Sequence, residues 1–325
     1  MLKLWVMGCA VCVSLLGAGT VAAQKVDFDQ GVDAKGVVPT PDAQDAKQVV
    51  PGTPAQVTVK TYQVSATHKK HGMGFIKKRL PHSDWVNWLT VGAAPAQVPS
   101  TFDLRPKLTQ VEDQGQCGSC WAFSLTATNR DGHALGAGDP GRLSQEWLVD
   151  NSKEADGCNG GNFDSALEFI TPKGQPLWSA CPYQTGSGKC AADLKPAASI
   201  TGWHMLGDPT KGPSQLEIES YMVSAGKPIS IAVGAGTGDW MNYNGGVYNG
   251  CTMGDLDHMI NIVGWDNEGA KFDATGNLPA GKGVWILRNS WGKSWGEDGY
   301  MRTKMSDAQG QRCNNVAGQA AFFDF

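Results

Sequence analysis

The chain has 325 residues, of which 41% are hydrophobic and 18% charged. This balance is typical of a globular protein with two domains or one large one, and forty-two glycines with twelve tryptophans favour a loop-rich, aromatic-packed fold over a helical bundle. The formal net charge of −4 gives no reason to expect a nucleic-acid partner.

Residues 1–23 predict a secretory signal peptide. Lys3 precedes an apolar run from Leu4 to Leu16, and small residues follow up to Ala23, after which we expect cleavage. The run is too short and wrongly flanked to span a membrane. We therefore expect an exported protein, extracellular or periplasmic rather than lysosome-like, without membrane contact once the signal is removed.

Residues 24–97 differ in character from the rest of the chain. A weakly ordered stretch precedes a basic cluster at 68–79, and Trp85 and Trp88 follow. This leader has nine basic and six acidic side chains, whereas 98–325 has seventeen and twenty-five. A basic leader beside an acidic body indicates a propeptide docked on the body of its own chain, and a solvated charged face is the alternative interpretation.

The stretch QGQCGSCWAFS at 114–124 contains the strongest chemical signal. Cys120 stands at the start of an apolar, helix-like run, where the helix dipole favours a thiolate, the nucleophilic form of cysteine. Gln114 supplies a neutral amide donor for an oxyanion. The pattern predicts acyl transfer through cysteine, although Cys117 and Cys120 also form a C-x-x-C, the pattern of a redox dithiol.

Helices are expected before strands along the body. Ser144 is the predicted N-cap of a helix within 143–151, a glycine turn leads into a helix within 157–170, and Ser214 opens a capping box that ends at Gly226. Strands rich in Ile and Val are predicted at 229–233, 258–265, 283–291 and 299–305. This order indicates an α+β protein with two unlike halves.

Three histidines lie in the body, and only His258 opens an apolar strand. His133 and His204 are interpreted as structural residues. Asn289 follows in the segment RNSWGKSWGEDGYMR, where an amide oxygen can accept the imidazole N–H and fix its tautomer. The polar, glycine-rich stretch 266–283 between them is expected to be an elongated hairpin tip.

These residues and motifs resemble those of papain-like cysteine peptidases. The signature C-G-S-C-W at 117–121 matches the family pattern, His258 lies 138 residues after Cys120, and residues 98–105 are similar to the first residues of the mature enzymes. The resemblance implies a helical domain at about 110–210, a β-barrel-like domain at about 211–310, and an active-site cleft between them.

The resemblance also implies roles for individual residues. Cys120 would be the nucleophile of an endopeptidase, His258 the base and Asn289 its orienter, while Gln114 and the Cys120 N–H would stabilise the oxyanion. No cofactor and no metal are expected. Gly160 and Gly161 would hydrogen-bond an extended substrate, and Trp291 would shield the contact between His258 and Asn289 from water. An apolar pocket for the second residue before the scissile bond would be lined by Phe163, Ala232, Leu256, Met259 and Gly318.

Six cysteines remain in the body once Cys120 is set aside, and the sequence by itself leaves fifteen pairings open. The resemblance implies bonds Cys117–Cys158 and Cys251–Cys313. The cysteine that would normally pair with Cys190 is absent, so Cys181–Cys190 is the expected local substitute.

The leader is expected to inhibit the enzyme and to be released by acid. The segment around Trp85, Trp88 and Leu89 is the predicted docking element, and residues 92–97 are expected to run through the cleft near Cys120; the alternative is a merely solubilising tail. Expected partners are protein or peptide substrates, the leader itself and protein inhibitors of the cystatin type. A catalytically silent binding or adhesion module is the rival function.

Overall fold

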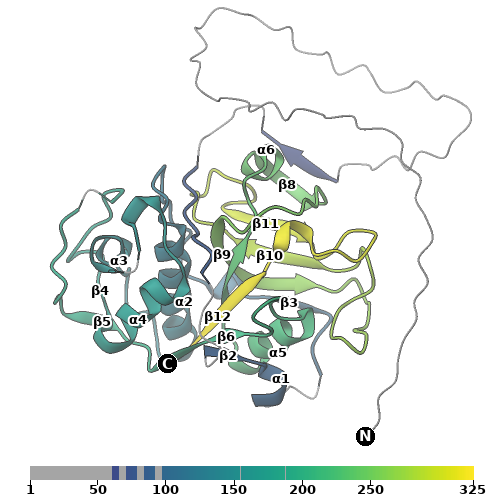
Figure 1. The fold of residues 1–325 in the computed structure, drawn as a ribbon, viewed down its shortest axis with the longest axis horizontal. Coiled ribbons are helices and arrows are strands. Elements are labelled where there is room, and N and C mark those ends of the chain that lie inside the picture. The colour runs from purple at the N-terminus through teal and green to yellow at the C-terminus, as the bar shows by residue number, and fades with distance from the viewer. Residues whose placement is uncertain (1–60, 66–70, 79–83, 92–96, 154, 187) are drawn as a thin grey trace, which may run out of the picture. The chain divides into compact units, whose positions relative to one another are not determined.

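A computed structural model describes residues 61–65, 71–78, 84–91, 97–153, 155–186 and 188–325 (Figure 1). All of them belong to one compact unit, Val57–Phe325. The predicted signal peptide and residues 24–60 lie outside the described residues. Among those described, no helix combines the length and the apolar character needed to cross a bilayer.

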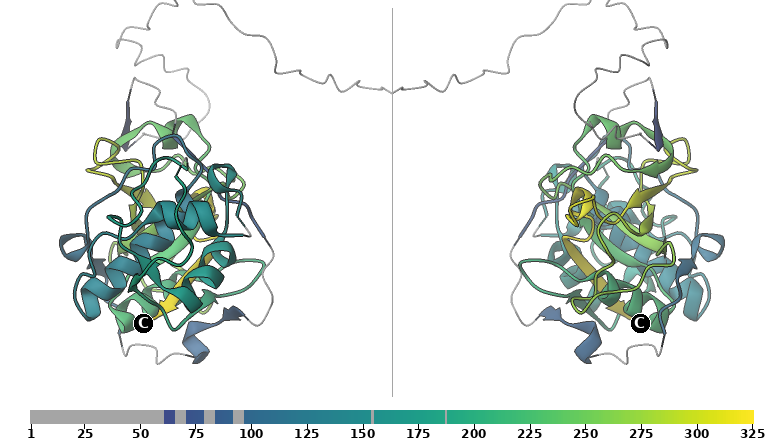
Figure 2. Two further views of the ribbon diagram at one scale, coloured as in Figure 1. Left: turned by 90° about the vertical axis from the view of Figure 1, so that its left-hand side faces the viewer. Right: turned by 90° about the vertical axis from the view of Figure 1, so that its right-hand side faces the viewer.

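Helices build one half of this unit. The largest is α2, which begins at the predicted nucleophile and is buried along most of its length. Its neighbours are short helices and a two-stranded sheet, shown toward the viewer in the left view of Figure 2. The elements of this half are α2 (Cys120–Gly136), α3 (Gln145–Asn151), η3 (Gly157–Asn159), α4 (Phe163–Lys173), β4 (Gln175–Pro176) and β5 (Pro196–Ala198).

Local capping chemistry sets where these helices begin. The Ser144 hydroxyl accepts the Trp147 N–H at 3.0 Å and opens α3, as predicted. Asn162 caps α4 through a reciprocal pair of bonds with Ser165. In the other half, Ser214 and Glu217 form the predicted capping box of α5 (Gln215–Ala225), which ends at Gly226 in the left-handed conformation.

A ten-stranded sheet forms the other half. The strand order is β1 (Tyr62–Val64), β8 (Tyr243–Tyr248), β11 (Tyr300–Lys304), β10 (Val284–Arg288), β9 (His258–Asp266), β7 (Ile229–Val233), β12 (Gln319–Asp324), β6 (Gly202–Leu206) and β2 (Trp85–Val86). The short strand β3 (Thr101–Asp103) also pairs with β9. Neighbours are antiparallel except β8–β11 and β6–β2. The remaining short elements are α1 (Trp88–Val91), η2 (Arg105–Lys107), α6 (Gly238–Met241) and η4 (Cys313–Asn315).

The α+β class is as predicted, with two corrections. The strand order among the described residues has two ends, β1 and β2, so this sheet is open and not barrel-like. The sheet also takes β1, β2, β3, β6 and β12 from outside the predicted range 211–310; the C-terminal strand β12, for example, returns to pair with β7 and β6.

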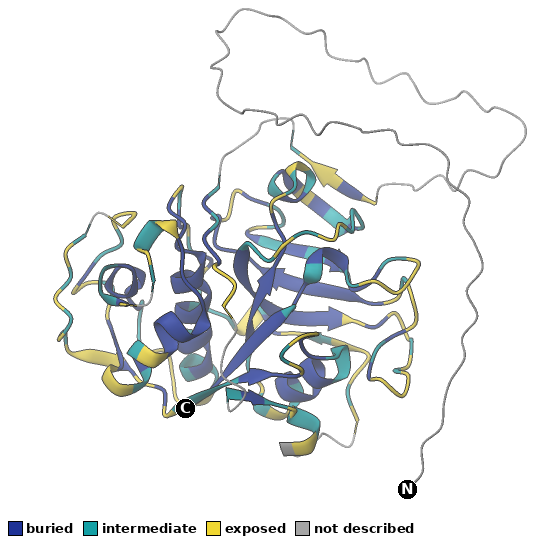
Figure 3. Ribbon diagram, in the orientation of Figure 1, coloured by how far each residue is buried: buried dark blue, intermediate teal, exposed yellow. Residues whose placement is uncertain are grey.

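Helix α2 and the central strands are buried together where the two halves meet (Figure 3). Buried polar contacts join them: the Ser124 hydroxyl lies 2.6 Å from that of Ser230 on β7, and Asn261 Nδ2 on β9 donates to the Ser124 carbonyl at 3.1 Å. Buried hydrogen bonds of this kind are costly to break. They fix the helix that carries Cys120 against the strand that begins at His258.

Candidate active site

Cys120 is the first residue of α2, and its side chain is fully buried. It is the free cysteine among the described residues. Burial raises the pKa of its thiol to about 12, although backbone hydrogen bonds from Met259, Gly74 and Trp121 act in the opposite direction. In this state the thiol is protonated at every physiological pH.

His258 begins β9 and meets Asn289, which follows β10. Its Nε2 lies 2.9 Å from Asn289 Oδ1, so the amide oxygen accepts from Nε2–H and Nδ1 is left as the basic nitrogen. The Trp291 ring stacks on the imidazole with centroids 4.7 Å apart. Burial lowers the pKa of His258 to about 4, the bond to Asn289 opposes this shift, and the charge of His71 adds to it.

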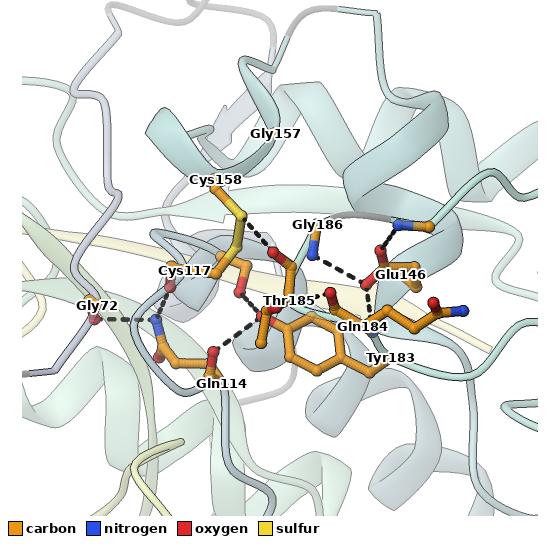
Figure 4. Close-up of a disulfide and its surroundings, with 12 residues drawn as sticks. Gly72, Gln114, Cys117, Glu146, Gly157, Cys158, Tyr183, Gln184, Thr185 and Gly186 are labelled. Atoms are coloured by element: carbon orange, nitrogen blue, oxygen red, sulfur yellow. Dashed lines mark hydrogen bonds between the residues drawn. A yellow bond between two sulfur atoms is a disulfide. The ribbon is translucent and has the colours of Figure 1, made fainter.

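Gln114 is buried beside these residues and is held at both ends of its amide. Its Oε1 accepts from the Ser290 hydroxyl at 2.6 Å, and its Nε2 donates to the carbonyls of Gly72 and Cys117, both at 2.9 Å. The Tyr183 hydroxyl donates to the Gln114 carbonyl at 2.9 Å (Figure 4). The side-chain N–H that the sequence assigned to an oxyanion therefore holds a carbonyl oxygen of the leader.

The leader crosses this site through residues 71–78. Phe75 N–H donates to the Asp257 carbonyl on the sheet side at 3.0 Å, while Gly161 N–H donates to the Gly74 carbonyl at 2.8 Å on the helical side. Added Cβ atoms at Gly72 and Gly74 would overlap the carbonyls of Cys117 and Gly118. Only glycine permits this close an approach.

Residues 92–96, most of the stretch predicted to run past Cys120, lie outside the described residues. Among the described residues, the segment that covers the thiol comes from the basic cluster. The predicted docking element at Trp85 and Trp88 contacts β6 and α5.

Phe75 enters the apolar pocket that the sequence outlined. Its ring packs edge-on against Phe163 with centroids 5.8 Å apart, and both belong to one buried cluster with Ala232 and Met259. Leu256 packs on the edge of that cluster, and Gly318 adjoins Leu256. The structure thus brings the five predicted pocket residues to one place.

Gly160 and Gly161 lie between α2 and residues 74–76 of the leader. Gly160 has φ +136°, and a Cβ there would meet Ile76 and the Gly74 carbonyl. The Gly161 backbone pairs with Phe75 in a parallel bridge. Both glycines therefore lie against an extended peptide segment.

The structure joins three cysteine pairs: Cys117–Cys158, Cys181–Cys190 and Cys251–Cys313. The first links the turn before Cys120 to the turn before Gly160 (Figure 4). Because Cys117 is bonded to Cys158, Cys120 has no dithiol partner in the C-x-x-C. A redox dithiol is therefore not supported.

The other two body histidines lie apart from this site. His133 Nε2 lies 3.0 Å from the Ser199 carbonyl, and His204 Nε2 lies 2.9 Å from Asp324. Among the described residues, one group of side chains has the spacing of metal ligands: Asp150, Cys181 and Cys190. The sulfurs of its two cysteines are bonded to each other. These contacts give no reason to assign a further catalytic or metal site.

Three contributors were missed in the sequence. Ser290 orients the Gln114 amide, Tyr183 bridges Gln114 and the Ser119 hydroxyl, and Gln319 donates to the Lys78 carbonyl at 3.3 Å. Ser290 lies inside the motif that carries Asn289, whereas Tyr183 and Gln319 stand in no pattern of their own. Gly72 and Gly74, inside the basic cluster, were the available sequence signal that residues 71–78 pass close to another part of the backbone.

Comparison with known proteins agrees with this geometry. The model of the papain family cysteine protease matches residues 98–321. Thiol protease SEN102 of Hemerocallis sp. is 37% identical over 239 residues, which cover 71% of this chain and 61% of that protein. Vignain of Phaseolus vulgaris is 39% identical over 213 residues, covering 63% of this chain and 54% of that protein. The chain thus spans less than two thirds of these relatives' length.

Solved structures of precursors are also similar. Procathepsin L2 from the larval midgut of Tenebrio molitor aligns with a TM-score of 0.65 and 27% identity over 82% of this chain and 84% of that chain. Recombinant stem bromelain precursor aligns with a TM-score of 0.63 and 26% identity over the same shares. The fold is papain-like, and the chain belongs to the papain family of cysteine proteases.

Proposed function

We propose that this protein is a cysteine endopeptidase, made as an exported zymogen, that hydrolyses peptide bonds through a thioester on Cys120. The observation that carries the proposal is the carbonyl of Gly72, held by the Gln114 amide beside a buried free thiol. A peptide carbonyl at this position has the surroundings that acyl transfer requires.

In the proposed mechanism, Cys120 gives its proton to His258 Nδ1 and its sulfur attacks the carbonyl carbon. The resulting oxyanion accepts hydrogen bonds from Gln114 Nε2 and the Cys120 backbone N–H. The tetrahedral intermediate collapses to a thioester as His258 protonates the departing amine. Water, deprotonated by His258, then releases the acid and regenerates the thiol. Asn289 keeps the imidazole in the required tautomer throughout.

Substrate selection follows from the pocket that Phe75 fills. It is apolar, and its described walls include Phe163, Ala232 and Met259. A hydrophobic side chain at the second position before the scissile bond is therefore favoured. Profiling of the activated enzyme on a peptide library tests this, and a preference for charged residues at that position would contradict it.

The leader, residues 24–97, acts as the inhibitor in this proposal. Segment 71–78 occupies the position that substrate needs, and Lys78 forms an ion pair with Asp164 at 2.9 Å. The leader carries more basic than acidic side chains and the body the reverse, and this attraction between them weakens as pH falls. A synthetic 24–97 peptide should inhibit the activated enzyme near neutral pH and less near pH 4–5. Absence of inhibition at both would eliminate this role.

Three disulfides in a chain with a predicted signal peptide suit an oxidising, exported location. The rival function is a silent papain-like binding module. Labelling of the acid-activated protein by an epoxide thiol probe, with Cys120→Ala as the control, separates the two. A protein that neither labels nor hydrolyses peptides would be the binding module.

A further inference from the structure

We propose that residues 84–91 stay with the active enzyme, as a permanent outer strand and helix, and that the activating cut falls on the N-terminal side of Asp84. The inference rests on the proposed function. It divides the leader into an inhibitory part that leaves and a structural part that remains.

The strand β2 is integrated into the sheet. Trp85 and Val86 pair in parallel with Met205 and Leu206 on β6, and Gly207 N–H donates to the Val86 carbonyl at 2.9 Å. The Trp85 side chain is 7% exposed and belongs to the same buried cluster as Met205. Removal of β2 would leave β6 as an unpaired edge with apolar side chains uncovered, which is an aggregation risk.

The helix α1 covers a second apolar surface. Trp88 packs edge-on against Tyr221 of α5 and Phe322 of β12, with ring centroids 5.3 and 5.1 Å away. Tyr221 and Phe322 are each 2% exposed with α1 in place. Aromatic contacts of this kind contribute packing energy beyond their buried area. Loss of α1 would therefore open the core of the sheet half.

Segment 71–78 is held in a different way. Glycine backbone atoms make its closest contacts, Ile76 is 45% exposed, and the Lys78 side chain is 47% exposed. Phe75 is its large buried aromatic side chain, and the pocket that holds it is the proposed substrate pocket. This segment can leave without uncovering the core, whereas 84–91 cannot.

The first test locates the N-terminus of the folded body. Full-length Cys120→Ala, which cannot process itself, is digested with a protease of broad specificity, and the resistant core is identified by intact mass and N-terminal sequencing. We expect a core that begins at or before Asp84. A stable core that begins after Asp84 overturns the inference. Activity of the wild-type protein, measured separately, reports on the proposed function alone.

The second test separates the two parts of the leader by matched variants. Trp88→Ala should lower the Tm of the activated enzyme by several degrees, whereas Phe75→Ala should leave that Tm unchanged and raise the activity of the uncut chain. Trp88→Phe is the milder variant if Trp88→Ala fails to fold. An activated Trp88 variant with wild-type Tm would show that α1 departs with the inhibitor.

Discussion

At the residue scale, the thiol and the imidazole are both neutral while the leader covers them. Burial raises the pKa of Cys120 to about 12 and lowers the pKa of His258 to about 4. The proposed attack requires a thiolate, so in this mechanism the covered site is held in an unreactive protonation state. Removal of residues 71–78 would restore water to both groups and allow the proton to pass from sulfur to nitrogen.

The depressed pKa of His258 predicts release by acid. Below its ordinary pKa of 6.5 the uncovered histidine takes up a proton that the covered one does not. The equilibrium constant for binding of the leader over the site therefore falls by up to about tenfold per pH unit until about pH 4. Initial activation rates of the full chain should rise across this window. His71→Gln removes one cause of the shift, so the pKa of covered His258 should rise and the acid-driven increase in activation rate should be smaller. A pH-independent activation rate would contradict the linkage.

Catalytic roles predict a graded series of losses. Cys120→Ala should abolish hydrolysis with the fold intact, because no covalent route remains. Gln114→Ala should lower kcat by about 100- to 1000-fold, the usual cost of one oxyanion donor. Asn289→Ala should be milder than Cys120→Ala, since the base remains. The assay is peptide hydrolysis by the activated proteins, with circular dichroism to verify folding. Hydrolysis by Cys120→Ala at the wild-type rate would refute the assignment.

At the element scale, the path of segment 71–78 across the site depends on glycine at positions 72 and 74. Gly74→Ala would place a Cβ against the Gly118 carbonyl, which is backbone and cannot move aside. The uncut Gly74→Ala chain should therefore be active before processing. Ile76→Ala is the matched control, because that side chain is 45% exposed. Equal latency of both variants and wild type would show that the segment does not inhibit.

At the scale of the whole molecule, a buried ion pair joins the two halves. Arg288 on β10 pairs with Asp131 on α2, with side chains 3% and 1% exposed. Asp131→Ala would leave the arginine buried without its partner, which typically costs about 3–5 kcal/mol. Asp103→Ala breaks the half-exposed pair with Arg105 and should cost under about 1 kcal/mol. Denaturant unfolding of the two variants gives the comparison; similar losses would mean that the buried pair has no special role.

The sequence determined the local features of this protein. Strand β7 has its predicted bounds, and α3 and α5 begin at their predicted caps, because capping bonds and side-chain periodicity involve residues close together in the chain. The motifs around Cys120, His258 and Asn289 likewise identified the family before any packing was known.

Tertiary structure alone decided which part of the leader covers the thiol. Residues 72–74 lie more than forty positions before Cys120, and they reach it because two glycines fit against the turn at 117–118 and Phe75 packs in an apolar pocket. The open sheet and the neutral thiol–imidazole pair have the same origin. Contacts between segments far apart in the chain, and the loss of water that they cause, leave no periodic signal in the sequence.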